Sequence, residues 1–234
     1  MSDLFTVQDT TSDVITRQLL QNLEGVESFA YEGTKSFTDA FGEALNAFME
    51  VIKEWFGSQP EVIDAKEFNE GYAEKASEVM AEVFDQQTLE DWSRMTLEER
   101  AEKLDEFYVK MGAELGIDAK GVIIADLGEG TFGMSDGSGY IYVDYRILQD
   151  PEMLSEALNT TLHEARHQMQ FDAIANPENF PDISPALIEA WERNIINYNT
   201  GAFDFEDYYN QAVEVDSRVF AADVIEAYIN KMGL

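Results

Sequence analysis

The sequence predicts an α+β protein that is mostly helical, with one small antiparallel sheet in the second half of the chain. Three observations support this fold class. Apolar residues recur every three or four positions over long stretches, which is the period of an amphipathic helix. Between residues 120 and 144 this period gives way to a β-branched run, several glycines and an alternating segment, as expected for strands joined by turns. Beyond residue 150 the helical period returns, with capping residues at the expected helix ends.

The N-terminal part of the chain predicts a helical region. An early helix is indicated by Leu19, Leu20, Leu23 and Val26. A longer apolar stripe follows at helical spacing, formed by Phe37, Phe41, Leu45, Phe48, Ile52 and Trp55. The segment 57–60, Gly-Ser-Gln-Pro, interrupts the pattern and predicts a boundary between residues 1–60 and a domain over 61–234. Aromatic stripes of this kind pack into a core or against a partner helix, so the first region is a candidate for self-association or partner binding.

The middle of the chain predicts one capped helix and then the sheet. Thr96 and Glu99 have the spacing of a capping box, and apolar residues recur from there until Gly116 ends the helix. The run 122–124 and the alternating segment 140–144 predict strands, and the glycines between them predict turns. The aspartates in this segment do not have the spacing of an EF-hand calcium loop.

Three further helices are expected after the sheet. Asp150 followed by Pro151 predicts the start of a helix that continues to about Ala175, where Asn-Pro stops it. Ser184 followed by Pro185 predicts the next helix. Asp207 is the expected cap of the last helix, which should extend to Lys231.

Composition excludes several classes of function. The net charge of −32 arises from 47 acidic and 15 basic residues, and such a surface repels nucleic acids and anionic membranes. The chain contains no cysteine, so disulfides and thiolate ligands are excluded. No apolar run is long enough for a transmembrane helix, and no basic N-terminal region of a secretory signal is present. We therefore expect a cytoplasmic protein, or one released without a secretory signal peptide.

Both histidines of the chain lie in one short segment of the helix predicted after residue 150. His163, Glu164 and His167 form the pattern HExxH. Residues four apart share one face of a helix, so the two imidazoles can bind the same metal ion. Glu164 then lies close enough to act on a metal-bound water. The spacing indicates a site for one zinc ion in a hydrolase.

A catalytic zinc site usually has three protein ligands, and here the third must be a carboxylate. Glu214 is the first candidate because it begins a small, apolar face of the final helix, where a buried acid needs a partner or a metal. Asp216 is the nearest alternative. Weaker alternatives are Glu189, Glu192, Asp204 and Glu206.

The combination of HExxH with a distant glutamate resembles the gluzincin branch of zinc metallopeptidases. The segment 214–222, EVDSRVFAA, is similar to the E-x-x-A-x-x-F-A-A segment of ImmA/IrrE-type peptidases, with Ser217 where that pattern has alanine. The glycine-rich sheet also resembles that of a minimal zincin, and the similarity covers roughly residues 90–230. The resemblance implies that His163, His167 and Glu214 bind zinc and that Glu164 is the general base. The chain departs from the usual zincin motif at Arg166, which must turn away from the metal or pair with an acid.

These residues predict a zinc-dependent metallopeptidase that hydrolyses proteins or peptides. An edge strand of the sheet beside the HExxH helix is the expected place for an extended substrate. Tyr208 and Tyr209 are candidate donors to the oxyanion, and Asp216 is a candidate partner of a ligand imidazole. Two other hypotheses stay open: a non-catalytic binding or structural protein on a zincin scaffold, and an acidic mimic that binds basic proteins.

Overall fold

A computed structural model describes residues 37–57, 66–199, 208 and 210–234. Its described part is mostly helical with one three-stranded sheet, which confirms the predicted α+β class. The helix expected near residues 19–26 and the interruption at 58–60 lie outside the described residues. The division of the chain at residue 60 therefore stays a prediction.

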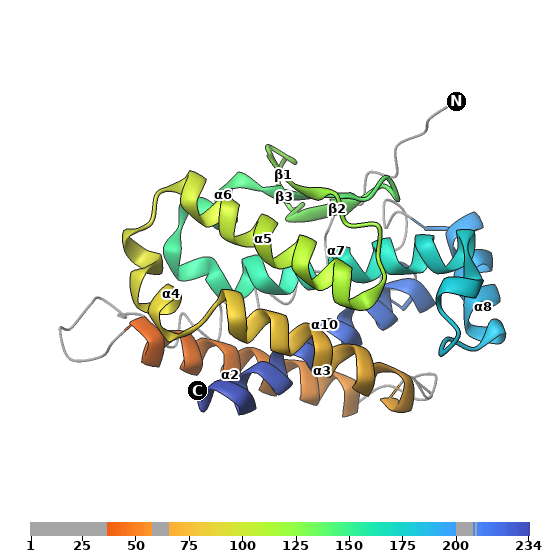
Figure 1. Ribbon diagram of the computed structural model, residues 1–234, viewed down its shortest axis with the longest axis horizontal. Helices are drawn as coiled ribbons and strands as arrows, with labels where there is room; N and C mark the ends of the chain where they lie inside the picture. Colours follow the sequence, from red (N-terminus) through yellow and green to blue (C-terminus); the bar gives the residue numbers. More distant parts are fainter. Residues whose placement is uncertain (1–36, 58–65, 200–207, 209) are drawn as a thin grey trace.

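The described elements form three layers, with the sheet at the top of Figure 1. Beneath the sheet lie α5 (Leu97–Leu115) and α7 (Leu154–Ala175), which both pack against its strands. A lower layer holds α2 (Phe37–Gly57), α3 (Lys66–Val83) and α10 (Ala212–Met232). Because α10 packs on α7, the lower layer supports the helix that carries HExxH. The shorter helices are α4 (Gln86–Asp91), α6 (Tyr145–Gln149) and α8 (Pro185–Ile196), with 3₁₀ turns η1 (Trp92–Arg94), η2 (Pro151–Met153) and η3 (Pro177–Asn179).

The sheet is mixed, which corrects the antiparallel prediction. Its order is β1 (Gly121–Ala125), β3 (Tyr140–Asp144), β2 (Gly133–Ser135), with β1 parallel and β2 antiparallel to the central β3. The connection after β1 carries the chain to the far side of β3, where Asp144 accepts a hydrogen bond from Leu127 N at 2.8 Å. Gly133, predicted as a turn residue, lies in the edge strand β2. Alternation and glycine content do not reveal which strands become neighbours, because pairing depends on these long-range contacts.

Local capping signals produced the predicted helix ends in the middle of the chain. The Thr96 hydroxyl accepts from Glu99 N, and the Glu99 carboxylate accepts from Thr96 N, so the capping box before α5 is confirmed. Gly116 ends α5 at φ +74°, in the left-handed region that glycine adopts without strain. The Ser184 hydroxyl caps α8 by accepting from Leu187 N, and Asn176 ends α7.

The start of α10 differs from the prediction, because Gln211 and not Asp207 is its N-cap residue. The helix begins at Ala212, and Val213 N donates to the side-chain oxygen of Asn194 at 2.9 Å. A cap supplied from the end of α8 is a tertiary contact, so residue preferences near position 207 could not reveal it. The helix predicted to start after Asp150 begins with a 3₁₀ turn: Asp150 caps η2 by accepting from Glu152 N, and α7 itself starts at Leu154.

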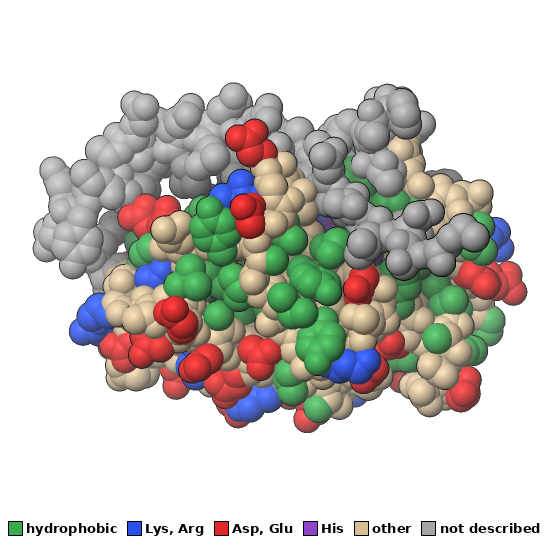
Figure 2. Space-filling view, turned by 90° about the horizontal axis from the view of Figure 1, so that it is seen from above, with side chains coloured by type: hydrophobic (Ala, Val, Ile, Leu, Met, Phe, Trp, Pro, Cys, Tyr) green, Lys and Arg blue, Asp and Glu red, His purple; other side chains and the backbone are tan. Residues whose placement is uncertain are grey.

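The outer face of the sheet carries apolar side chains. The pairing places Ile123, Tyr142 and Met134 in one row across the three strands, while Ile141 and Val143 point into the core. Figure 2, which looks onto this face, shows apolar groups gathered in its middle and acidic groups spread around them. Within the described ranges, every helix is too short or too polar to cross a membrane.

Candidate metal and catalytic site

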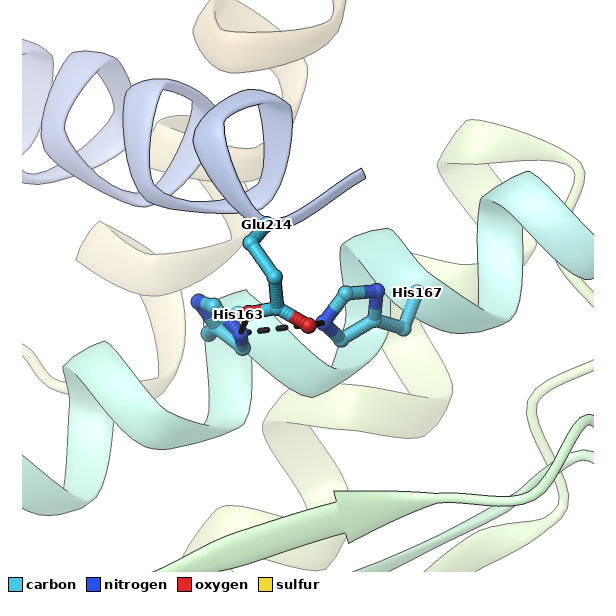
Figure 3. A group of neighbouring side chains, drawn as sticks. All are labelled: His163, His167 and Glu214. Carbon is cyan, nitrogen blue, oxygen red and sulfur yellow. Dashed lines mark hydrogen bonds and ion pairs between the residues drawn. The ribbon is translucent and has the colours of Figure 1, made fainter. Parts of the chain in front are cut away.

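The structure brings His163, His167 and Glu214 together. The two histidines lie on adjacent turns of α7, and Glu214 reaches down between them from the first turn of α10 (Figure 3). The two histidine Nε2 atoms are 3.0 Å apart, and they lie 3.3 Å from different oxygens of Glu214, that of His163 from Oε2 and that of His167 from Oε1. Packing of α10 on α7 therefore joins residues from two distant parts of the sequence.

This donor set fits a zinc ion. Ligand atoms at about 2.1 Å from a tetrahedral zinc are separated by about 3.4 Å, close to the distances found here. Glu214 is fully buried, and its Oε2 atom has no hydrogen-bond partner among the described residues. Burial of such an oxygen is unfavourable unless a cation or donor meets it. All three ligand atoms lie within 4.8 Å of one another, so one ion can contact them together.

The charges of these groups are coupled. Burial opposes ionisation of Glu214, but the neighbouring imidazoles outweigh it and lower the pKa of this carboxyl well below its usual value. Burial also tends to lower the pKa of His167, yet the Glu214 carboxylate raises it to about 9. Without a metal, the carboxylate therefore stays ionised and His167 carries a proton at neutral pH.

Glu164 lies on the flank of the histidine pair, against the edge strand β2. It is buried, and the backbone N–H of Ser135 donates a hydrogen bond to it. Burial and the nearby Glu214 carboxylate raise the pKa of Glu164 to about 7, although His167 and Ser135 act in the opposite direction. A carboxyl with a pKa near neutrality can both accept and return a proton, as a general base must.

Gly133 provides the space that Glu164 occupies. A Cβ atom at residue 133 would lie 2.5 Å from Thr160 Cγ2 and 2.8 Å from both Glu164 Cγ and Oε1. Alanine here should therefore displace Glu164 and lower the free energy of unfolding by about 1–3 kcal/mol, as overpacking does.

The measurement is denaturant unfolding of Gly133→Ala beside Gly71→Ala. Gly71 is an exposed helical position with no atom within 4 Å of the added Cβ, so this control should gain up to about 1 kcal/mol. A Gly133→Ala protein as stable as the parent would contradict the close contact with α7.

The far side of the His167 ring is also held in place. His167 Nδ1 lies 2.9 Å from Gln170 Oε1 and 3.3 Å from Ser217 Oγ, which leaves Nε2 directed at His163 and Glu214. Gln170 Nε2 donates in turn to Asp216 Oδ2 at 2.7 Å. Asp216, predicted as a partner of a ligand imidazole, therefore acts on His167 through Gln170.

Arg166 points away from the histidines and pairs with an acid. Its guanidinium makes two hydrogen bonds to Asp216, at 2.8 and 2.9 Å, and is fully buried between the rings of Trp191 and Phe220. The departure from the zincin motif thus joins α7 to α10, and its positive charge is neutralised by Asp216.

Tyr198 is a site residue that the sequence analysis missed. Its hydroxyl donates to Glu214 Oε1 at 2.6 Å, and burial together with Glu214 raises the pKa of Tyr198 far above the usual value. The predicted donor Tyr208 is buried, with its ring edge-on to that of Tyr198 at 6.0 Å, whereas Tyr209 lies outside the described residues. Tyr198 follows the end of α8 without any motif around it, so no sequence signal could have identified it.

The weaker candidates for the third ligand do not join this cluster where they are described. Glu189 is exposed and forms a surface pair with Arg193, and Glu192 is also exposed. Asp204 and Glu206 lie outside the described residues. Asp216 is engaged by Arg166 and Gln170, which leaves Glu214 beside the imidazoles.

Comparisons with known proteins identify no relative of this chain. No protein-family model matches it, and searches of curated proteins and of solved structures give no significant match. The resemblance to gluzincins therefore depends on the motif residues themselves.

Proposed function

We propose that this protein is a zinc-dependent metallopeptidase that cleaves peptide bonds. The observation that carries the proposal is the convergence of His163, His167 and Glu214, with Glu164 held on the flank of the same site. Three protein ligands from two helices are the usual set of a catalytic zinc, whereas structural zinc sites generally have four.

Each residue of the site has a role in the proposed hydrolysis. A zinc ion bound by His163, His167 and Glu214 would supply Lewis acidity and lower the pKa of a bound water. Glu164 would be the base that accepts a proton from the attacking water and returns it to the nitrogen of the leaving amine. The Ser135 N–H holds Glu164 at the edge of β2, where an extended substrate can add as a further strand.

The proposal predicts one zinc ion per chain, bound more tightly as the pH rises. Zinc must displace the proton that His167 holds in the metal-free site, where the Glu214 carboxylate raises the pKa of this imidazole to about 9. Affinity should therefore increase up to about tenfold per pH unit below pH 9 and level off above it. Competition titrations with a chromophoric chelator at several pH values measure this slope.

The control is His163→Ala, which removes one ligand and leaves the rest of α7 unchanged. Elemental analysis should find zinc in the parent and not in this variant. The zinc-loaded parent should also cleave members of a mixture of unstructured peptides, as detected by mass spectrometry, and His163→Ala should not. A parent that binds zinc but leaves every peptide intact would favour the non-catalytic scaffold instead.

A further inference from the structure

The two carboxylate oxygens of Glu214 have different surroundings. Oε1 accepts the hydroxyl hydrogen of Tyr198 at 2.6 Å. Oε2 is buried and has no hydrogen-bond partner in the described part of the chain. Nη1 of Arg218 lies 4.0 Å from Oε2, which is too long for a hydrogen bond. Each oxygen lies 3.3 Å from one imidazole, Oε1 from His167 and Oε2 from His163, but only Oε1 also accepts a short hydrogen bond from the protein.

The hydroxyl of Tyr198 is held in position by the surrounding backbone. Tyr198 N donates to Ile195 O at 3.3 Å, which continues the end of α8. The Gln211 amide then binds both backbone groups of Asn199, accepting from its N–H and donating to its C=O, each at 2.8 Å. Gln211 is the N-cap residue of the helix that carries Glu214. Gln211 therefore links the backbone beside Tyr198 to the start of the helix that carries Glu214.

This asymmetry determines how a carboxylate can bind a metal. A carboxylate that uses both oxygens occupies an additional coordination position, whereas one that uses a single oxygen leaves that position for water. A short hydrogen bond from a phenol draws electron density from Oε1 and directs its lone pair away from the ion. Oε2, buried without such a bond, is then the better donor.

We propose that Tyr198 is a positioning residue that restricts Glu214 to one-oxygen coordination through Oε2 and so keeps a position open for water. The proposal rests on the zinc site proposed above. It adds the reason why that site keeps an open coordination position, as catalytic zinc sites do. It assigns Tyr198 a role through Glu214 and not through direct contact with substrate.

The test is the absorption spectrum of the protein loaded with Co²⁺ in place of zinc. Four-coordinate Co²⁺ has intense visible bands, and a fifth ligand atom weakens them. Tyr198→Phe frees Oε1 to bind the ion, so its visible absorptivity should fall about twofold or more relative to the parent, with one Co²⁺ still bound per chain. Tyr140→Phe is the matched control, because it removes the same hydroxyl from an exposed side chain of β3 and should keep the parent spectrum.

A second variant covers the case in which Tyr198→Phe does not fold, as judged by circular dichroism. Gln211→Ala keeps the Tyr198 hydroxyl but removes the two hydrogen bonds that hold the neighbouring Asn199 backbone. It should therefore weaken the visible Co²⁺ bands, by less than Tyr198→Phe does. Parent-like spectra in the folded variants would overturn the role of Tyr198 and leave the metallopeptidase proposal intact. A parent spectrum that is already five-coordinate would do the same. A parent that binds neither Co²⁺ nor zinc would instead overturn the metal site itself.

Discussion

Glu164→Gln should lose peptide hydrolysis by a factor of about 10²–10⁴ while one zinc ion stays bound, because general base catalysis contributes about this much. Glutamine has nearly the same shape as glutamate and its amide oxygen can still accept from Ser135 N–H, but it cannot take a proton from water. Glu164 is not among the three grouped ligands, so metal affinity should change little. The fold should tolerate the change, since burial already disfavours the charged form of this side chain.

The measurement combines zinc content with cleavage of the peptide mixture. Glu189→Gln is a suitable control, because it makes the same chemical change at an exposed surface position and should leave both quantities at parent values. Parent-like cleavage by Glu164→Gln would remove the general base from the mechanism. If Glu164→Gln lost both its zinc and its cleavage activity, Glu164 would contribute to the metal site and not to proton transfer.

Asp216→Ala should lower the free energy of unfolding by about 3–5 kcal/mol, because it leaves a buried arginine without its carboxylate. Arg166 is completely buried, and Asp216 accepts two hydrogen bonds from it as well as one from Gln170. The pair also joins α7 to α10, so its loss should weaken the packing that places Glu214 beside the histidines. Metal-free protein gives the clearest measurement, since bound zinc stabilises the same helix pair.

Two comparisons make this result specific to the buried pair. Glu189→Ala breaks an exposed pair with Arg193 and should change stability by no more than about 1 kcal/mol. The double variant Arg166→Met, Asp216→Leu removes both charges and should recover much of the loss, because well-packed apolar side chains often replace a buried ion pair. Chemical denaturation of all four proteins provides the test, and an equal, small loss in Asp216→Ala and Glu189→Ala would contradict the burial of the pair.

Much of the helical scaffold follows from short-range signals in the sequence. Thr96 and Glu99 specify the start of α5 by hydrogen bonds within three residues, and Gly116 specifies its end through one backbone angle. The two histidines share a face of α7 because residues four apart always do so on a helix. Predictions of this kind depend only on residues close together in the sequence and therefore need no knowledge of the fold.

The remaining features depend on contacts between distant residues. The parallel pairing of β1 with β3, the Asn194 cap of α10 and the hydrogen bond from Tyr198 to Glu214 each join segments that no local pattern connects. Helical periodicity and a motif resemblance could indicate Glu214 as the third ligand, but its distance from the imidazoles follows from the packing of α10 on α7. Residue types and spacing thus specified the helices and the candidate ligands. Packing set the order of the strands, the orientation of Arg166 and the place of Tyr198, because burial and hydrogen bonding are satisfied only when the whole chain is assembled.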